Sequence, residues 1–99
     1  MAAQLITLQT LELMLKTIIK SYAQRGVDHV DVTGKDFYLS VGTPEMFDVY
    51  QTPSEPLPVG SLADDMAELK KLLIDPDRMA TAVDIERLGN VLRAVSELI

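Results

Sequence analysis

The sequence predicts a small α+β domain, in which an N-terminal helix precedes a three-stranded antiparallel meander and two C-terminal helices pack on one face of that sheet. The chain has 99 residues, which suits a single domain spanning residues 1–99. Apolar residues recur with a helical period at both ends, whereas residues 27–50 alternate in part. Aromatic residues form only 5% of the chain, so aliphatic side chains and methionine must fill the core.

The first predicted helix covers residues 7–25. Its apolar residues are spaced by three and four, which places Leu8, Leu11, Leu15, Ile18 and Tyr22 in one stripe. Gly26 suits the left-handed residue that ends a helix. The helix is more apolar than one buried face requires, because Leu5, Leu13 and Ile19 add to this stripe. We therefore expect either a central helix covered on two sides or a partner molecule that contacts these three residues.

Three strands are predicted at residues 28–32, 37–41 and 47–50. Each segment contains β-branched or aromatic residues with some alternation. Turn-forming residues at 33–36 and 42–45 separate them. Because the connections are short, the simplest arrangement is an antiparallel meander.

Two further helices are predicted after a proline-rich connection at residues 52–60. Ser61 is a good N-cap for the first, and Pro76 prevents it from continuing. Thr81 starts the second, in which Gly89 costs about 1 kcal/mol relative to alanine and so indicates the close approach of another element. The stripe of the last helix consists of Ile85, Leu88, Leu92, Val95 and Ile99.

The charge and cysteine content exclude several classes of function. The net charge is −6, with nine basic and fifteen acidic residues, which disfavours binding to nucleic acids or to anionic membranes. The absence of cysteine excludes disulfides, cysteine-bound zinc and thiol catalysis, and fits a reducing compartment. With no signal peptide and no apolar run long enough to span a bilayer, we expect a soluble, cytoplasmic protein.

Few residues suggest chemistry. His29 is the only histidine and lies between Asp28 and Asp31, where it is either a general base or an exposed strand residue. Asp64 and Asp65 begin a helix, where the helix dipole stabilises carboxylates. No motif for catalysis, metal binding or phosphate binding is present, so we expect no catalytic residues, no metal and no cofactor.

Two hypotheses about function remain. The first is a non-enzymatic interaction module that forms a homo-oligomer or joins a protein partner, with Leu5, Leu13 and Ile19 in the interface. The alternative is a regulatory domain that binds a small molecule between sheet and helices, through Tyr38, Tyr50 and His29. The phenols of Tyr38 and Tyr50 could instead belong to a protein contact, where tyrosine is enriched. An enzyme with an unfamiliar site ranks third.

Overall fold

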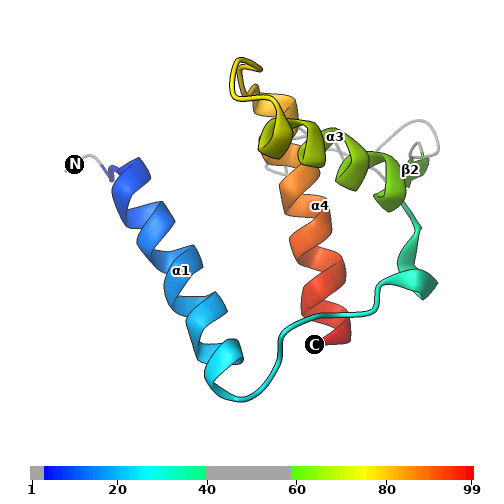
Figure 1. The fold of residues 1–99 in the computed structure, drawn as a ribbon, viewed down its shortest axis with the longest axis horizontal. Helices are drawn as coiled ribbons and strands as arrows, with labels where there is room; N and C mark the ends of the chain where they lie inside the picture. Colours follow the sequence, from blue (N-terminus) through cyan, green and yellow to red (C-terminus); the bar gives the residue numbers. More distant parts are fainter. Residues whose placement is uncertain (1–3, 40–58) are drawn as a thin grey trace. The chain divides into compact units, whose positions relative to one another are not determined.

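The computed structural model describes residues 4–39 and 59–99, and its contacts divide the chain into two compact units, Met1–Val30 and Asp31–Ile99 (Figure 1). The elements in the described ranges are the helices α1 (Leu8–Gln24), α3 (Leu62–Ile74) and α4 (Ala82–Leu98), the 3-10 turn η1 (Thr33–Lys35), and the strands β1 (Phe37–Leu39) and β2 (Val59–Ser61).

The first unit consists of α1 and the chain that flanks it. The Thr7 side chain caps the helix by accepting a hydrogen bond from the backbone N–H of Thr10 at 3.1 Å. Gly26 follows the helix with a positive φ of 85°, a conformation that a side chain would strain. The predicted bounds of this helix are therefore confirmed to within one residue. No residue of α1 is buried.

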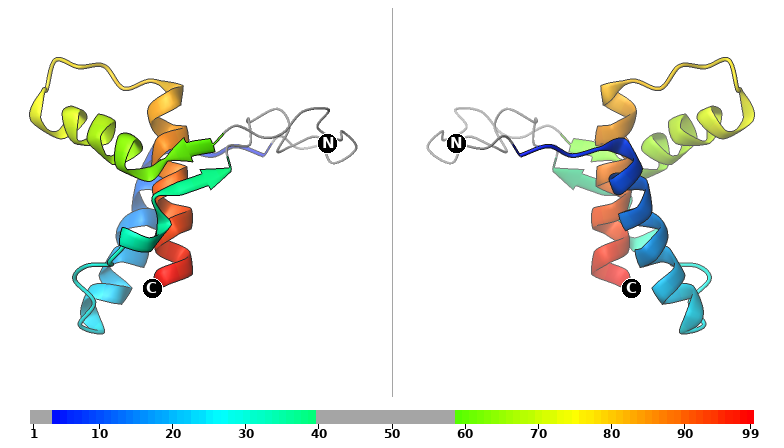
Figure 2. Two further views of the ribbon diagram at one scale, coloured as in Figure 1. Left: turned by 90° about the vertical axis from the view of Figure 1, so that its right-hand side faces the viewer. Right: turned by 90° about the vertical axis from the view of Figure 1, so that its left-hand side faces the viewer.

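The second unit is built from α3, α4 and a pair of short strands (Figure 2). Ser61 caps α3, because its hydroxyl accepts a hydrogen bond from the backbone N–H of Asp64. The Asp36 carboxylate accepts a second hydrogen bond at this end of the helix, from the backbone N–H of Ala63 at 3.0 Å. At the start of α4, Thr81 and Asp84 form a reciprocal capping box. These caps explain why both C-terminal helices begin where the sequence predicts.

The predicted three-stranded meander is wrong. Among the described residues the sheet has two strands, in which β1 runs antiparallel to β2 and Tyr38 pairs with Gly60. Residues 28–32 form no strand, and the third predicted strand, 47–50, lies outside the described residues. β2 instead uses the end of the predicted proline-rich connection. The two helices do not cover a face of a broad sheet; α3 and α4 pack mainly on each other.

A local hydrogen-bonding pattern explains the loss of the first predicted strand. The carboxylate of Asp31 accepts from the backbone N–H of Thr33 at 3.0 Å and from its hydroxyl at 2.5 Å. Such short-range bonds between an Asp side chain and nearby backbone compete with strand pairing and turn the chain. The 3-10 turn η1 follows directly. Turn chemistry therefore outweighs the partial alternation of Val30 and Val32.

The interior of the second unit is small and unusually polar. Leu62, with 2% of its surface exposed, is the only apolar side chain that is fully buried in the described part of the chain. Two carboxylates, Asp65 and Asp84, are also buried. Burial of charge without partners would be destabilising, so the hydrogen bonds of these two groups are central to the stability of this unit.

Gly60 is required by the aromatic ring that lies against it. A Cβ atom built at this position would collide with the ring of Tyr38, its partner across the strand pair. We expect Gly60→Ala to lower the free energy of unfolding by about 1–3 kcal/mol, the usual result of overpacking. Urea denaturation measures this loss. Gly34→Ala is the matched control, because a Cβ at Gly34 meets nothing within 4 Å; equal losses for both variants would contradict the assignment.

Candidate functional site

A hydrogen-bonded centre around Tyr38 joins three elements of the second unit. The phenol of Tyr38 on β1 donates to the carboxylate of Asp65 on α3 and accepts from the side-chain amide of Asn90 on α4, at 3.0 Å. Burial raises the pKa of Tyr38 to about 12, and the neighbouring Asp65 carboxylate adds to this shift. The raised pKa keeps the phenol neutral, which is the form that can donate a hydrogen bond to a carboxylate. The two hydrogen bonds connect the strand β1 to both helices, α3 and α4.

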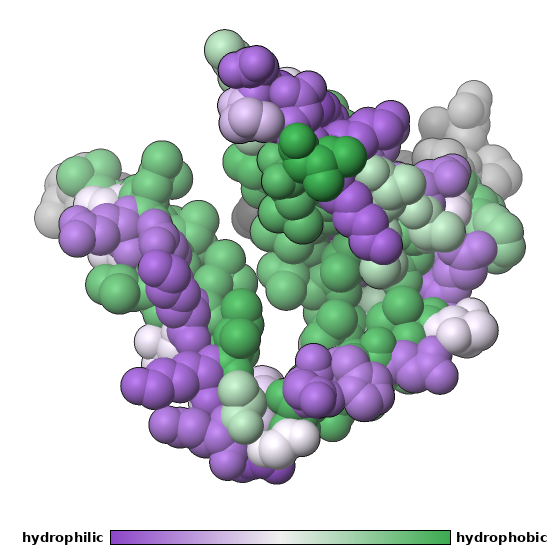
Figure 3. Space-filling view, in the orientation of Figure 1, coloured by the Kyte–Doolittle hydropathy of each residue, from purple (hydrophilic) through white to green (hydrophobic). Residues whose placement is uncertain are grey.

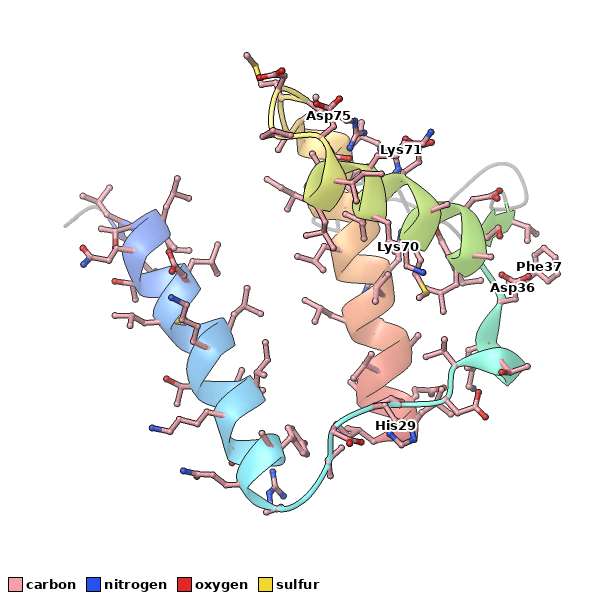
Figure 4. All side chains as sticks on the ribbon, viewed as in Figure 1. His29, Asp36, Phe37, Lys70, Lys71 and Asp75 are labelled. Carbon is pink, nitrogen blue, oxygen red and sulfur yellow. The ribbon has the colours of Figure 1, made fainter. Side chains whose placement is uncertain are left out.

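A pocket of about 500 Å³ opens beside this centre, between η1, β1 and the C-terminal half of α4. Leu62 and Tyr38 contribute to its lining, and Phe37, which is 74% exposed, lies beside the N-terminal end of α3 and also lines the pocket (Figure 4). Its charged groups include Lys35 and Glu97, which form an ion pair with 2.6 Å between nitrogen and oxygen. The pocket therefore offers an apolar wall and a charged rim.

Tyr38, one of the three residues predicted to bind a ligand, lines this pocket. His29 belongs to the first unit, in the extended segment after α1 (Figure 4), and its side chain is 86% exposed. The imidazole Nδ1 of His29 lies 2.5 Å from the carboxylate of Asp28, which is equally exposed. Tyr50 lies outside the described residues. Within the second unit, the described residues therefore place one member of the predicted ligand set, Tyr38, at the pocket.

A second polar centre surrounds Asp84 at the start of α4. Its carboxylate accepts from the backbone N–H of Thr81 at 2.9 Å and from the guanidinium groups of Arg87 and Arg78 at 2.9 and 3.3 Å. The backbone hydrogen bond, followed by the two arginines, lowers the pKa of Asp84. Arg78 also donates to the backbone carbonyl of Glu68 at 3.1 Å. These contacts tie the connection after α3 to both helices, which is a structural role.

Three residues of these polar centres carry no such role in the sequence predictions. The sequence predicts a helix-dipole role for Asp65 and no role for Asn90 or Arg87. The spacing of Asp84 and Arg87, three residues apart on one helix, is a visible signal for their ion pair. No local signal links Tyr38 to Asp65 or Asn90, because these contacts span 27 and 52 residues. In the described ranges, no cluster of His, Cys, Asp or Glu is suited to holding a metal ion.

The residues predicted for an interface are exposed on the first unit. The exposed fractions are 83% for Leu5, 58% for Leu13 and 65% for Ile19. Leu13 lies on the side of α1 opposite the main stripe, as expected for about 3.6 residues per turn, and lines an open hollow with Met14 and Ile18. In Figure 3 a hydrophilic band runs along α1, with hydrophobic surface on both sides of it. The helix thus presents apolar surface in two directions.

The second unit also carries exposed apolar side chains in a regular row. They lie on α4 and at its C-cap, Ile99, with exposed fractions of 74% for Ile85, 39% for Leu88, 43% for Leu92 and 45% for Ile99. These are four of the five residues of the stripe predicted for the last helix, so this stripe is largely exposed within this unit. The opposite side of α4, which carries Asn90, is the one that contacts the Tyr38 centre.

The fold and these surfaces define a small, mainly helical protein with polar buried centres and exposed apolar helix faces. Within the described ranges, no helix combines the length and apolarity needed to cross a bilayer. The chain matches no protein-family model, no curated protein and no solved structure.

Proposed function

We propose that this chain is a non-enzymatic interaction module that associates with further copies of itself through α1. The observation that carries the proposal is that α1 contains no buried residue although apolar side chains cover two of its sides. A cytoplasmic location is part of the proposal, supported by the absence of cysteine.

The physical argument concerns the stability of α1 itself. Helices of this length are marginal in water unless an amphipathic face packs against something. Covering apolar surface contributes about 25 cal/mol per Å², and the exposed leucines and isoleucines of α1 supply that surface. An identical chain is the simplest cover, since symmetric homodimers are the commonest soluble oligomers.

Parallel substitutions in the full chain test this proposal. We expect Ile19→Glu, at an exposed side chain that adjoins the main stripe, to convert an oligomer to a monomer while the helical circular dichroism is retained. Leu13→Glu, on the opposite side of α1, tests whether that side also belongs to the contact. Gln9→Glu is the control, since it adds the same charge to an exposed polar position of α1. Sedimentation velocity measures the association. Unchanged association in both variants, or unfolding of both, would contradict an interface at these residues.

The pocket beside Tyr38 favours a second candidate function, the binding of a small molecule by the second unit. Its volume suits a small metabolite. The Tyr38 hydroxyl is already hydrogen-bonded to Asp65 and Asn90, so recognition would depend on the apolar wall and on Lys35. A thermal-shift screen with common metabolites and ions tests this function, because a ligand that binds only the folded state raises the melting temperature. The absence of any shift would count against it.

A further inference from the structure

The exposed row on α4, which we call the outer stripe, resembles an unpaired helix contact. It consists of Ile85, Leu88, Leu92, Val95 and Ile99, spaced by three, four, three and four residues, and all of them except the half-buried Val95 are exposed. This spacing produces a continuous seam when two helices pack side by side. Because the opposite side of α4 already contacts Tyr38 through Asn90, the outer stripe is available for a second helix.

The stripe of α1 matches the outer stripe in length and spacing. Leu8, Leu11, Leu15, Ile18 and Tyr22 follow the same order of three, four, three and four residues, and α1 and α4 both contain 17 residues. Two helices of equal length and equal period can keep their apolar side chains in contact from end to end. The stripes are therefore geometrically suited to each other.

Charge favours this pairing over the contact of the outer stripe with the outer stripe of another copy. Residues 1–30 carry three basic and two acidic side chains, whereas residues 31–99 carry six basic and thirteen acidic side chains. Pairing of the acidic unit with itself is therefore disfavoured by repulsion, and pairing with the weakly basic α1 segment is favoured.

Gly89 supports the approach of another helix at this face. It lies next to the outer stripe in the middle of α4, where glycine is less favourable than alanine. A Cβ atom at Gly89 would meet nothing within 4 Å in the described part of one copy. The close approach that the sequence predicts at Gly89 is thus not made there, and a docked helix from another copy would supply it.

We propose that α1 of one copy docks along the outer stripe of α4 of a second copy, and that the reciprocal contact closes a symmetric dimer. This inference rests on the proposed self-association and names the surface that receives α1. It implies two equivalent contacts per dimer, each made of one α1 and one α4.

Complementation between two variants of the full chain tests this pairing. Leu11→Glu damages the α1 stripe and Leu92→Glu damages the outer stripe, at positions with nearly equal exposed fractions of 45% and 43%. Each variant alone has both contacts damaged and is expected to lose the dimer. Their mixture retains one intact contact, so a heterodimer is expected. Native mass spectrometry with one chain labelled with ¹⁵N identifies it, and circular dichroism confirms that each variant is folded.

The control is the double variant, which carries both substitutions, mixed with Leu11→Glu. Neither chain of this mixture has an intact α1 stripe, so no heterodimer is expected. A dimeric wild-type protein whose two variants fail to form a heterodimer would overturn the α1–α4 pairing and leave self-association intact. Retention of the dimer by Leu92→Glu alone would also overturn the pairing. A wild-type chain that is monomeric would instead overturn the proposed function, and this inference with it.

Discussion

Replacement of Asp84 with alanine is expected to lower the melting temperature by about 5 °C or more, because one buried carboxylate caps α4 and binds two arginines. The substitution removes the acceptor of the Thr81 backbone N–H. It also leaves Arg78 and Arg87, both only 26% exposed, without this carboxylate. Asp84→Asn, which retains an acceptor for Thr81 but no charge, should show a smaller loss. Thermal unfolding followed by circular dichroism measures both.

The matched control for Asp84 is Glu97→Gln. Glu97 also forms an ion pair, with Lys35 at 2.6 Å, but its side chain is 65% exposed. Exposed ion pairs contribute little to stability, so this variant should melt within about 2 °C of the wild type. Equal effects at Glu97 and Asp84 would show that the buried centre has no special role.

Asp84 also makes the folding stability depend on pH in the acidic range. Its pKa in the folded state lies below the ordinary value. The stabilising contribution is therefore present above the unfolded pKa and is lost as the pH falls through the folded pKa. Stability should decrease below about pH 4, and it should decrease less steeply in Asp84→Ala than in the wild type.

The second large effect is expected for Tyr38→Phe. The substitution keeps the ring and removes the hydroxyl that donates to the buried Asp65 carboxylate. A buried acceptor that loses its donor costs about 1–3 kcal/mol, which urea denaturation measures. Tyr22→Phe is the control, since it keeps the ring that contacts the Arg25 guanidinium, 4.2 Å from the ring centroid. If both variants unfold alike, the Tyr38 centre is not a stabilising contact.

At alkaline pH the stability is expected to fall as the pH rises, because of Tyr38. The pKa of Tyr38 is raised from 10.0 to about 12 in the folded protein. Its contribution is complete below the unfolded value and is lost as the pH rises through the folded pKa. Wild-type stability should therefore fall between about pH 10 and pH 12, and Tyr38→Phe should show less of this fall. Ultraviolet absorbance of the phenolate follows the titration directly.

The helices could be predicted from the sequence because their signals are local. Thr7, Ser61 and Thr81 cap the three helices at the expected positions, and Gly26 follows the first. The sheet could not be predicted, because the strand that pairs with β1 begins at Val59, about twenty residues further along the chain, and no local pattern marks it. In addition, the hydrogen bond that the Asp31 carboxylate accepts from the backbone N–H of Thr33 turns the chain where alternation favours a strand.

The candidate sites show the same limit. Periodicity identified the stripes of α1 and α4, yet it carries no information about what covers them, and the α4 stripe is largely exposed. The Tyr38 centre depends on three residues from three elements, and only the fold brings Asp65 and Asn90 to the phenol. Periodicity thus indicates apolar helix faces, whereas long-range polar contacts leave no local pattern in the sequence.

Sedimentation equilibrium of the wild-type chain at micromolar concentrations tests self-association most directly. We expect a species of about twice the 10.9 kDa chain mass that dissociates on dilution. A single species of 10.9 kDa at every concentration would contradict it.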